Sequence, residues 1–197
     1  MSQNFTKEER RRQLLDAAVQ VFGKKGYHET QISDIIKKAG VARGTFYLYF
    51  TSKREIFAAL MEELFEQVSS QVKSLPREAV DQIPSQLLGN IERITTLLLD
   101  NPLLTRLLFA EAMGLDKELD TQLKRFYTQI LNYIQRGLKQ GQEMKFVRDG
   151  DVPTMSIALL GSFKEIFYQN LLGTEKIKRD TLLSEYFQFV VSAIIQK

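Results

Sequence analysis

Apolar residues recur at intervals of three and four positions along most of the chain, which is the period of an amphipathic α-helix. The clearest example lies within residues 6–25, where Leu14, Ala18 and Phe22 belong to one apolar stripe. No segment alternates apolar and polar residues as a half-buried β-strand would. The pattern predicts an all-α protein of about nine helices. The predicted helices cover residues 6–25, 31–39, 42–49, 53–74, 79–100, 102–114, 117–140, 152–172 and 179–195.

Capping signals indicate where several of these helices begin. Thr6 and Glu9 have the spacing of a capping box at the start of the first helix. Ser52 stands directly before the long fourth helix and is a favourable N-cap residue. Asn101 followed by Pro102 is typical of an N-cap and the first helical position, so a new helix is expected to start there.

Residues 31–50 have the sequence form of a helix-turn-helix, which is a helix, a tight turn and a second helix. Gly40 supplies the positive φ that such a turn needs. Phe46 and Phe50 are four residues apart, so both are expected to face the core. The other side chains of the second helix then point outward, and they are Arg43, Thr45, Tyr47, Leu48 and Tyr49.

This outward set suits DNA, because hydroxyl groups donate to phosphate oxygens and an arginine can bind guanine through two hydrogen bonds. Gly44 allows a close backbone approach, with the amides of a helix N-terminus pointing at phosphate. In this motif the second helix lies in the major groove and the first crosses the DNA backbone. A cluster of aromatic residues at helical spacing is also typical of a protein core, so the pattern leaves both interpretations open.

The distribution of charge divides the chain into two parts. Residues 1–54 carry eleven Lys and Arg against five Asp and Glu, whereas residues 55–197 carry sixteen against nineteen. The net charge of the whole chain is only +3. A basic N-terminal part on an acidic remainder favours a polyanion-binding head, although a solvated basic surface would have the same composition.

The composition excludes several kinds of site. With no Cys and a single His, the chain has no disulfide, no thiolate metal site, no Cys nucleophile and no pair of His ligands. We therefore predict no catalytic residues, no metal and no cofactor. The polar N-terminus is unlike a secretory signal, and the apolar stretches are too short to cross a bilayer, so we expect a cytoplasmic protein without membrane contact.

Apolar, glycine and aromatic positions form an extended pattern at fixed spacing between residues 11 and 60. They are Leu14, Ala17, Ala18, Phe22, Gly26, Tyr27, Thr30, Ile32, Ile35, the run Ala39–Val41, the run Gly44–Phe50, Ser52, Lys53, Ile56 and Phe57. On these positions the segment resembles the DNA-binding head of the TetR (tetracycline-repressor) family of bacterial regulators. The remainder of the chain is similar to that family only in its length, its number of helices and the break over residues 141–151.

The resemblance implies roles for individual residues of the head. The residues implied to contact DNA are Thr30, Ser33, Ala42, Arg43, Gly44, Thr45, Tyr47, Leu48, Tyr49 and Lys53. Arg43 matches a position that reads bases, and Ala42 and Leu48 lie beside it, within reach of thymine methyl groups. Lys53 matches a lysine that binds phosphate, and Thr30 with Ser33 matches positions that contact the DNA backbone.

The resemblance also implies a division of labour along the chain. Residues 1–52 are predicted to be the DNA-binding domain, and residues 53–197 the ligand-binding and dimerisation domain. In the family the last two helices form a homodimer, and here residues 152–172 and 179–195 both carry dense apolar faces. Such faces could instead pack within one chain. Two-fold pairing would place the DNA half-sites about 34–36 Å apart.

The middle helices contain many large apolar and aromatic side chains, and the family holds a small-molecule pocket in this part. The candidate pocket residues are Phe65, Leu98, Leu107, Phe109, Glu111, Met113, Phe126, Tyr127, Ile130 and Tyr133. Each of them is also compatible with ordinary core. Glu111 could receive a cationic ligand group, pair with an arginine or reach solvent, and a lipophilic ligand such as an acyl chain is equally compatible with the set.

The sequence thus predicts a homodimeric repressor that binds a palindromic DNA operator and is released by a small hydrophobic ligand, which would favour the DNA-incompetent shape. Two alternatives stay open. One is an all-α lipid-binding or small-molecule-binding protein, or an enzyme, whose helix-turn-helix is not coupled to the ligand. The other is a DNA-binding dimer whose body responds to a protein partner or to nothing. An elongated apolar cavity in the body would distinguish the predicted regulator from this last alternative.

Overall fold

The computed structural model describes residues 5–73, 82–111, 114, 117–173 and 177–196. Within these residues the chain forms nine α-helices and one π-helical turn, and its β-structure is a single bridge between Val147 and Ile195, so the predicted all-α class is confirmed. No helix in these ranges combines the length and apolarity needed to cross a membrane. The elements are α1 Lys7–Lys25, α2 Ile32–Ala39, α3 Arg43–Tyr47, α4 Lys53–Gln71, α5 Ile83–Asp100, α6 Pro102–Arg106, η2 Leu107–Glu111 (the π turn), α7 Lys117–Glu143, α8 Val152–Leu172 and α9 Arg179–Ile194.

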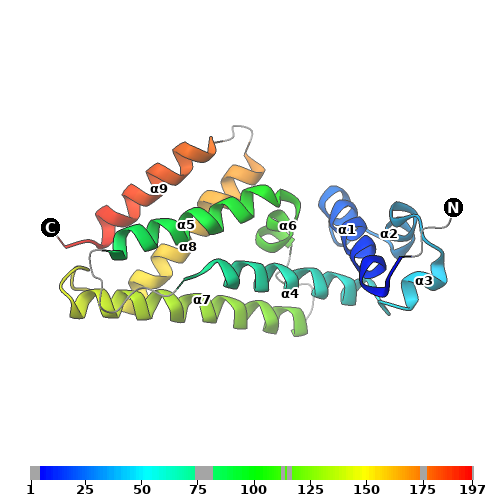
Figure 1. Cartoon of the computed structure of the whole chain (residues 1–197), viewed down its shortest axis with the longest axis horizontal. Coiled ribbons are helices and arrows are strands. Elements are labelled where there is room, and N and C mark those ends of the chain that lie inside the picture. The colour runs from blue at the N-terminus through cyan, green and yellow to red at the C-terminus, as the bar shows by residue number, and fades with distance from the viewer. Residues whose placement is uncertain (1–4, 74–81, 112–113, 115–116, 174–176, 197) are drawn as a thin grey trace.

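The helices form a small head and an elongated body (Figure 1). The head consists of α1, α2 and α3, and it lies at the opposite end of the molecule from the C-terminus. Helix α4 starts at the head and runs into the body alongside α7, where the rings of Phe65 and Phe126 stack with their centroids 4.1 Å apart. Because α4 belongs to both parts, any displacement of it within the body is carried to the head.

The first and fourth helices begin as their capping signals predict, and α6 begins at Pro102 directly after its N-cap residue Asn101, also as predicted. The Thr6 hydroxyl accepts from the backbone N–H of Glu9, and the Glu9 carboxylate accepts from the backbone N–H of Thr6. The Ser52 hydroxyl caps α4 in the same way. The side-chain amide of Asn101 donates to the carbonyl of Leu97 at 2.8 Å, so this side chain bonds to the end of α5, while the residue itself stands at the N-cap position of α6.

The single helix predicted over residues 102–114 is wrong in detail. Helix α6 ends at Arg106, and the chain continues as the π turn η2. The neighbouring residues Leu107 and Leu108 of this turn are both buried in the core. Helix α7 also runs three residues further than predicted, to Glu143.

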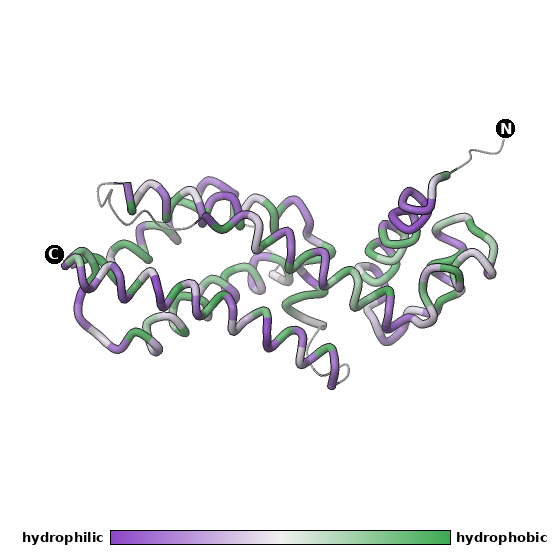
Figure 2. The backbone as a smooth tube through the Cα atoms, turned by 60° about the horizontal axis from the view of Figure 1, so that its bottom comes forward, coloured by the Kyte–Doolittle hydropathy of each residue, from purple (hydrophilic) through white to green (hydrophobic). Residues whose placement is uncertain are grey.

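One continuous core joins the head to the body. The α1 stripe is buried as predicted, and its Phe22 packs edge-on against Phe57 of α4, with the ring centroids 5.4 Å apart. The same cluster of buried residues extends through α4, α7 and α8 to Leu182 of α9. Figure 2 shows hydrophobic and hydrophilic positions alternating within the turns of the long helices, as expected when one side of each helix is buried.

Candidate DNA-binding surface and ligand cavity

The helix-turn-helix predicted from the sequence is present. Gly40 ends α2 in the left-handed conformation, with φ 66° and ψ 34°, and its N–H donates to the carbonyl of Ile36 at 3.0 Å. The neighbouring Ala39 carbonyl accepts from the side-chain amide of Gln13 on α1 at 2.7 Å. This tie fixes the turn to the first helix, so α3 is held at a defined angle to the rest of the head.

The large side chains of α3 and of the residues directly after it, Leu48 to Phe50, face different directions. Phe46 and Phe50 are buried, as their spacing predicts, whereas Tyr47 is 43% exposed and Leu48 is 79% exposed. The Arg43 guanidinium lies over the Tyr47 ring, 5.8 Å from its centroid. The two phenylalanines therefore belong to the core. The guanidinium of Arg43, the phenol of Tyr47 and the apolar side chain of Leu48 face solvent.

The other candidate residues near α3 differ in how much surface they offer. Ala42 and Gly44 are exposed, and a Cβ atom added to Gly44 would meet nothing within 4 Å. Thr45 and Tyr49 are half-buried, and Tyr49 packs against the core cluster. Ser33 is exposed in the first turn of α2, where its hydroxyl makes a long hydrogen bond of 3.4 Å to its neighbour Gln31. The exposed surface is thus centred on the start of α3.

The expectation that Thr30 contacts the DNA backbone does not fit its geometry. Thr30 is only 2% exposed, and its hydroxyl donates to the carbonyl of Gly26 at 2.7 Å. The hydroxyl hydrogen is therefore already used inside the loop between α1 and α2. A threonine in this position stabilises the loop and cannot donate to a phosphate without breaking that bond.

The phosphate-binding role expected for Lys53 does not fit either. Its Nζ donates to three backbone carbonyls, those of Tyr27 at 2.7 Å, His28 at 3.1 Å and Thr30 at 2.8 Å. The ammonium group also lies over the Tyr27 ring, 4.5 Å from its centroid. An ammonium group has three N–H donors, and all three are used here. Lys53 therefore fastens the start of α4 to the loop that leads into α2.

This arrangement predicts how operator binding responds to Lys53→Met. The variant removes the donor of three carbonyls and is expected to destabilise the protein by about 1 kcal/mol. The slope of log K against log salt concentration should stay unchanged, because no phosphate contact is lost. If the magnitude of this salt slope instead decreases by about one, Lys53 binds a phosphate. Urea unfolding and DNA titrations at several salt concentrations measure the two quantities, and Lys139→Met on exposed α7 surface is the control.

Charge at the start of α2 is balanced within the head. The Lys25 ammonium lies 2.8 Å from the Asp34 carboxylate, which also accepts from the backbone N–H of Gln31. These hydrogen bonds, the one from Lys25 foremost, hold the pKa of Asp34 below its ordinary value. Lys37 and Lys38 at the other end of α2 are exposed. Lys37 and Lys38 beside the turn, together with Arg43, therefore supply exposed positive charge that can attract an anion.

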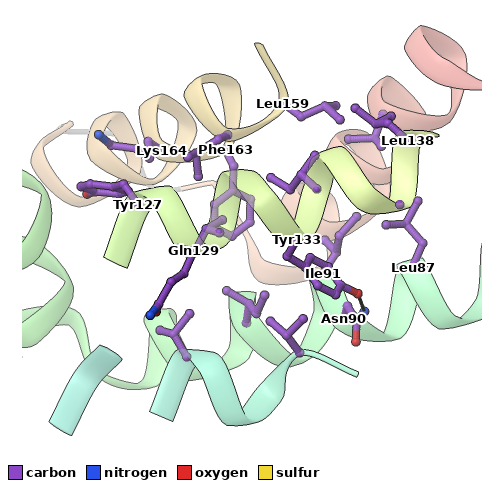
Figure 3. A pocket seen from close by; sticks show the side chains of 18 of the residues that line it. Leu87, Asn90, Ile91, Tyr127, Gln129, Tyr133, Leu138, Leu159, Phe163 and Lys164 are labelled. Atoms are coloured by element: carbon purple, nitrogen blue, oxygen red, sulfur yellow. Dashed lines mark hydrogen bonds between the residues drawn. The ribbon is translucent and has the colours of Figure 1, made fainter. Parts of the chain in front are cut away.

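The body contains a cavity of about 400 Å³ between α4, α5, α7, α8 and α9. This volume lies within the range of about 300–1,000 Å³ that is usual for small-molecule sites. Figure 3 shows side chains from several of these helices converging on it. The predicted pocket residues that line it are Leu98, Phe109, Phe126, Tyr127, Ile130 and Tyr133.

Four predicted pocket residues are not shown to line the cavity. Phe65 packs its ring on Phe126, and Leu107 is fully buried in the core, so neither is among the residues that line the cavity. The side chain of Glu111 and the whole of Met113 lie outside the described residues. Helical spacing does not distinguish a residue in the cavity wall from a residue buried behind that wall, because both lie on the apolar face of a helix.

Asn90 is a buried polar residue at one wall of the cavity, and it was not predicted from the sequence. Its carboxamide accepts from the Lys73 N–H at 3.0 Å and donates to the Lys73 carbonyl at 2.9 Å and the Tyr133 hydroxyl at 2.8 Å. Arg93 also donates to the Asn90 carbonyl oxygen. These bonds hold the chain where it leaves α4. An asparagine among the apolar positions Leu87, Ile91 and Ile94 was the signal that could have found it.

Lys164, which lines the cavity from α8, was also not predicted from the sequence. Its Nζ lies over the Tyr127 ring, 4.2 Å from the centroid, and Figure 3 shows the two side chains together. Burial lowers the pKa of Lys164 and raises the pKa of Tyr127 to about 12. The signal in the sequence was a lysine directly after Phe163 and three residues before Phe167, inside an otherwise apolar face.

Helices α8 and α9 divide their apolar residues between the core and an outer face. Phe163 and Tyr186 pack together inside, with ring centroids 5.4 Å apart, whereas Ile157 is 60% exposed and Phe189 is 53% exposed. Gly161 is exposed too, and a Cβ atom there would meet nothing within 4 Å. An outer face with two large apolar side chains and an open glycine is suited to contact another helix.

The comparisons with known proteins agree with this geometry. Residues 14–60 match the sequence profile of the bacterial regulatory proteins of the tetR family. The fatty acid metabolism regulator protein of Bacillus subtilis is 28% identical over 186 residues, which are 94% of this chain and 95% of that protein. The chain is also similar to the solved structure of the fatty acid degradation regulator FadR from Bacillus halodurans, with 25% identity, a TM-score of 0.76, and coverage of 95% and 97% of the two chains.

A further solved structure is the transcriptional regulator FadR from Bacillus subtilis in complex with stearoyl-CoA, with 27% identity, a TM-score of 0.73, and coverage of 93% and 98%. The family profile covers the helix-turn-helix, and these relatives extend the similarity over the whole body. The resemblance inferred from the sequence of the head is therefore confirmed: residues 14–60 match the tetR family of bacterial regulatory proteins, and the chain as a whole is similar to transcriptional regulators of that kind.

Proposed function

We propose that the protein is a homodimeric repressor that binds a palindromic operator through two heads and leaves it when a small apolar ligand fills the cavity of the body. One observation carries this proposal: helix α4 belongs both to the head with its exposed α3 surface and to the wall of a cavity of about 400 Å³. Residues 1–52 would serve DNA binding, and residues 53–197 ligand binding and dimerisation.

The DNA contacts that we propose come from the residues that are exposed around α3. Arg43 would read a base, most favourably guanine, and Tyr47 would donate its hydroxyl to a phosphate. Ala42 and Leu48 would touch thymine methyl groups, and Gly44 would admit the DNA backbone. Ser33 would reach a phosphate from the first turn of α2, while Thr45 and Tyr49 would contribute only their exposed edges.

The dimer that we propose forms through α8 and α9. The exposed Ile157 and Phe189 would be covered by the partner, and Gly161 would allow the two copies of α8 to approach closely. A four-helix contact of this kind is a common way to pair two identical chains. It would leave the heads free and hold them about 34–36 Å apart, which is one turn of DNA.

The coupling of ligand to DNA runs along α4 in this proposal. Val68, Ser69 and Val72 line the cavity at the end of α4, and Lys53 fastens its start to the head. A ligand that pushes the end of α4 outward would change the separation of the two heads. A coupling free energy of about 1–3 kcal/mol is sufficient to lower operator affinity roughly 5-fold to 150-fold.

A long acyl chain is the ligand that the cavity and the relatives support best. The wall is largely formed by Val, Leu, Ile, Phe and Tyr side chains. Two regulators that resemble this chain are named for fatty acid metabolism or degradation, and one of the solved structures holds stearoyl-CoA. A flexible aliphatic chain can fill an elongated apolar space without leaving polar groups unpaired.

The test is a mobility-shift titration with DNA from upstream of the protein's own gene, with and without palmitoyl-CoA. We expect a specific complex that the ligand dissociates. Arg43→Ala should weaken binding to this DNA by about tenfold and leave binding to unrelated DNA nearly unchanged, because a base contact is lost. Lys139→Ala serves as a control for loss of one positive charge. A parent protein that binds palmitoyl-CoA and no DNA would overturn the proposal in favour of a lipid-binding protein.

A further inference from the structure

The cavity is apolar but holds one charged group. Among the described residues that line it, Lys164 alone carries a formal charge, and the remaining side chains are neutral. Lys164 comes from α8, and its Nζ lies above the ring of Tyr127 on α7 (Figure 3). Leu87, Leu138 and Leu159 lie toward the opposite side of this view. The cavity therefore has a charged place at one end and aliphatic walls beyond it.

The ammonium group of Lys164 is only partly compensated. The face of the Tyr127 ring attracts it, with a distance of 4.2 Å to the ring centroid. None of the ion pairs found between described residues includes Lys164. Burial is the cause of its lowered pKa. Because Lys164 is partly buried, an anion brought beside its ammonium group is attracted more than it would be at a fully exposed lysine.

Asn90, a buried polar residue at one wall of the cavity, is not available to bind the polar end of the ligand. Both N–H donors of its carboxamide are used, one by the Lys73 carbonyl and one by the Tyr133 hydroxyl. Its carbonyl oxygen accepts from Lys73 and from Arg93. A ligand group could bind there only by displacing bonds that hold the end of α4. Lys164, unlike Asn90, can bind a ligand group without such a loss, and it is the charged one among the lining residues that the structure describes.

We propose that Lys164, seated on the Tyr127 ring, binds the anionic end of an amphiphilic effector whose aliphatic chain fills the rest of the cavity. This inference rests on the proposed function and names the chemistry of its ligand: a long alkyl chain that ends in a carboxylate or in a phosphate-bearing group. A free fatty acid and an acyl-CoA share this chemistry. A neutral lipid of the same chain length lacks it and forms the natural comparison.

The experiment measures the affinity of the full-length protein for palmitate, palmitoyl-CoA and hexadecanol by isothermal titration calorimetry. Lys164→Met keeps the length of the side chain and removes its charge. We expect it to weaken the binding of at least one anionic probe by about tenfold and to change hexadecanol less than twofold. Lys164→Arg should retain the affinity for the anion. Lys124→Met removes an exposed lysine of α7 and should leave all three affinities unchanged.

The pattern of loss decides both the role and the source of the anion. A loss for palmitate alone assigns the site to a carboxylate, and a loss for palmitoyl-CoA alone assigns it to the CoA phosphates. Equal weakening of all three probes would overturn the inference, because Lys164 would then act only through packing, and so would affinities that do not change. If hexadecanol binds and releases DNA but charge has no effect, the inference fails while the proposed function stands. If none of the probes binds, the ligand chemistry is wrong for both.

Discussion

Replacing Phe57 by alanine is expected to destabilise the protein by about 3–5 kcal/mol and to abolish operator binding at ordinary temperature, although it removes no DNA contact. The Phe57 ring is fully buried on α4 and packs edge-on against two head residues. Its centroid lies 5.4 Å from that of Phe22 and 4.8 Å from that of Tyr27. Because natural domains are stable by only about 5–15 kcal/mol, a cavity at this junction removes a large part of the total.

Urea unfolding and operator titrations at low temperature separate the two effects in this variant. Phe65→Ala is the matched control, because Phe65 lies two turns further along α4 and stacks on Phe126 in the body. It should lower stability and leave operator affinity near that of the parent wherever the protein is folded. If Phe57→Ala binds the operator as the parent does, the head is held by contacts other than this ring, and α4 is not its main support.

The fold could be predicted largely because the helical period is strong and the caps are local. Thr6 with Glu9 and the turn at Gly40 depend on residues within one or two turns, so sequence alone placed them. Asn101 and Pro102 likewise placed the start of α6, although the Asn101 amide bonds to the preceding helix. The end of α6 at Arg106 and the π turn after it were not predicted, because the apolar spacing of residues 102–114 is compatible with one continuous helix.

Among the candidate DNA-binding residues, the exposed ones lie where the sequence placed them, whereas Thr30 and Lys53 have partners that the sequence did not indicate. Tyr47 and Leu48 were expected outside because Phe46 and Phe50 had to be inside. The type of side chain at Thr30 and Lys53 also suits a phosphate contact. Their actual partners are carbonyl groups of the loop between α1 and α2, and no spacing rule indicates which carbonyls a loop turns inward.

The cavity shows the converse limit. Apolar spacing indicated which helix faces are buried, and six of the predicted residues do line the space. The polar residues Asn90 and Lys164 interrupt those apolar faces. The sequence did not predict them, because the candidates were selected mainly as large apolar and aromatic side chains. A single polar side chain inside an apolar stripe is costly unless it has a partner, so it is a stronger indicator of a site than another phenylalanine.

The head touches the body at a second place besides α4. Gly23 of α1 packs directly on Leu103 of α6, and a Cβ atom added to Gly23 would lie 2.6 Å from Leu103 Cδ2 and 2.9 Å from its Cβ. Salt bridges from Arg11 and Arg12 of α1 to Glu63 of α4, with N–O distances of 2.8 and 3.2 Å, support the same side of the head. They are partly exposed and contribute little to stability. The angle of the head therefore depends on a steric contact.

Gly23→Val is accordingly expected to destabilise the protein by about 3 kcal/mol, because the added methyl groups overlap with Leu103 and force α1 away from α6. Replacing a glycine within a helix ordinarily stabilises the protein by up to about 1 kcal/mol. A loss of stability in Gly23→Val would therefore indicate the close contact with Leu103. Operator affinity without ligand should fall as well, since the head is tilted. Urea unfolding and operator titrations measure both changes.

A second substitution shows whether the cause is steric. In Gly23→Val with Leu103→Ala, the space vacated by the leucine admits the new side chain, so the double variant should be more stable than the sum of the two single changes predicts. Gly44→Ala is the control, because a Cβ atom there meets nothing within 4 Å and stability should not fall. Strict additivity of the two single changes would mean that the valine is accommodated without Leu103. The body would then set the angle of the head through α4 alone, and only displacements of that helix could release DNA.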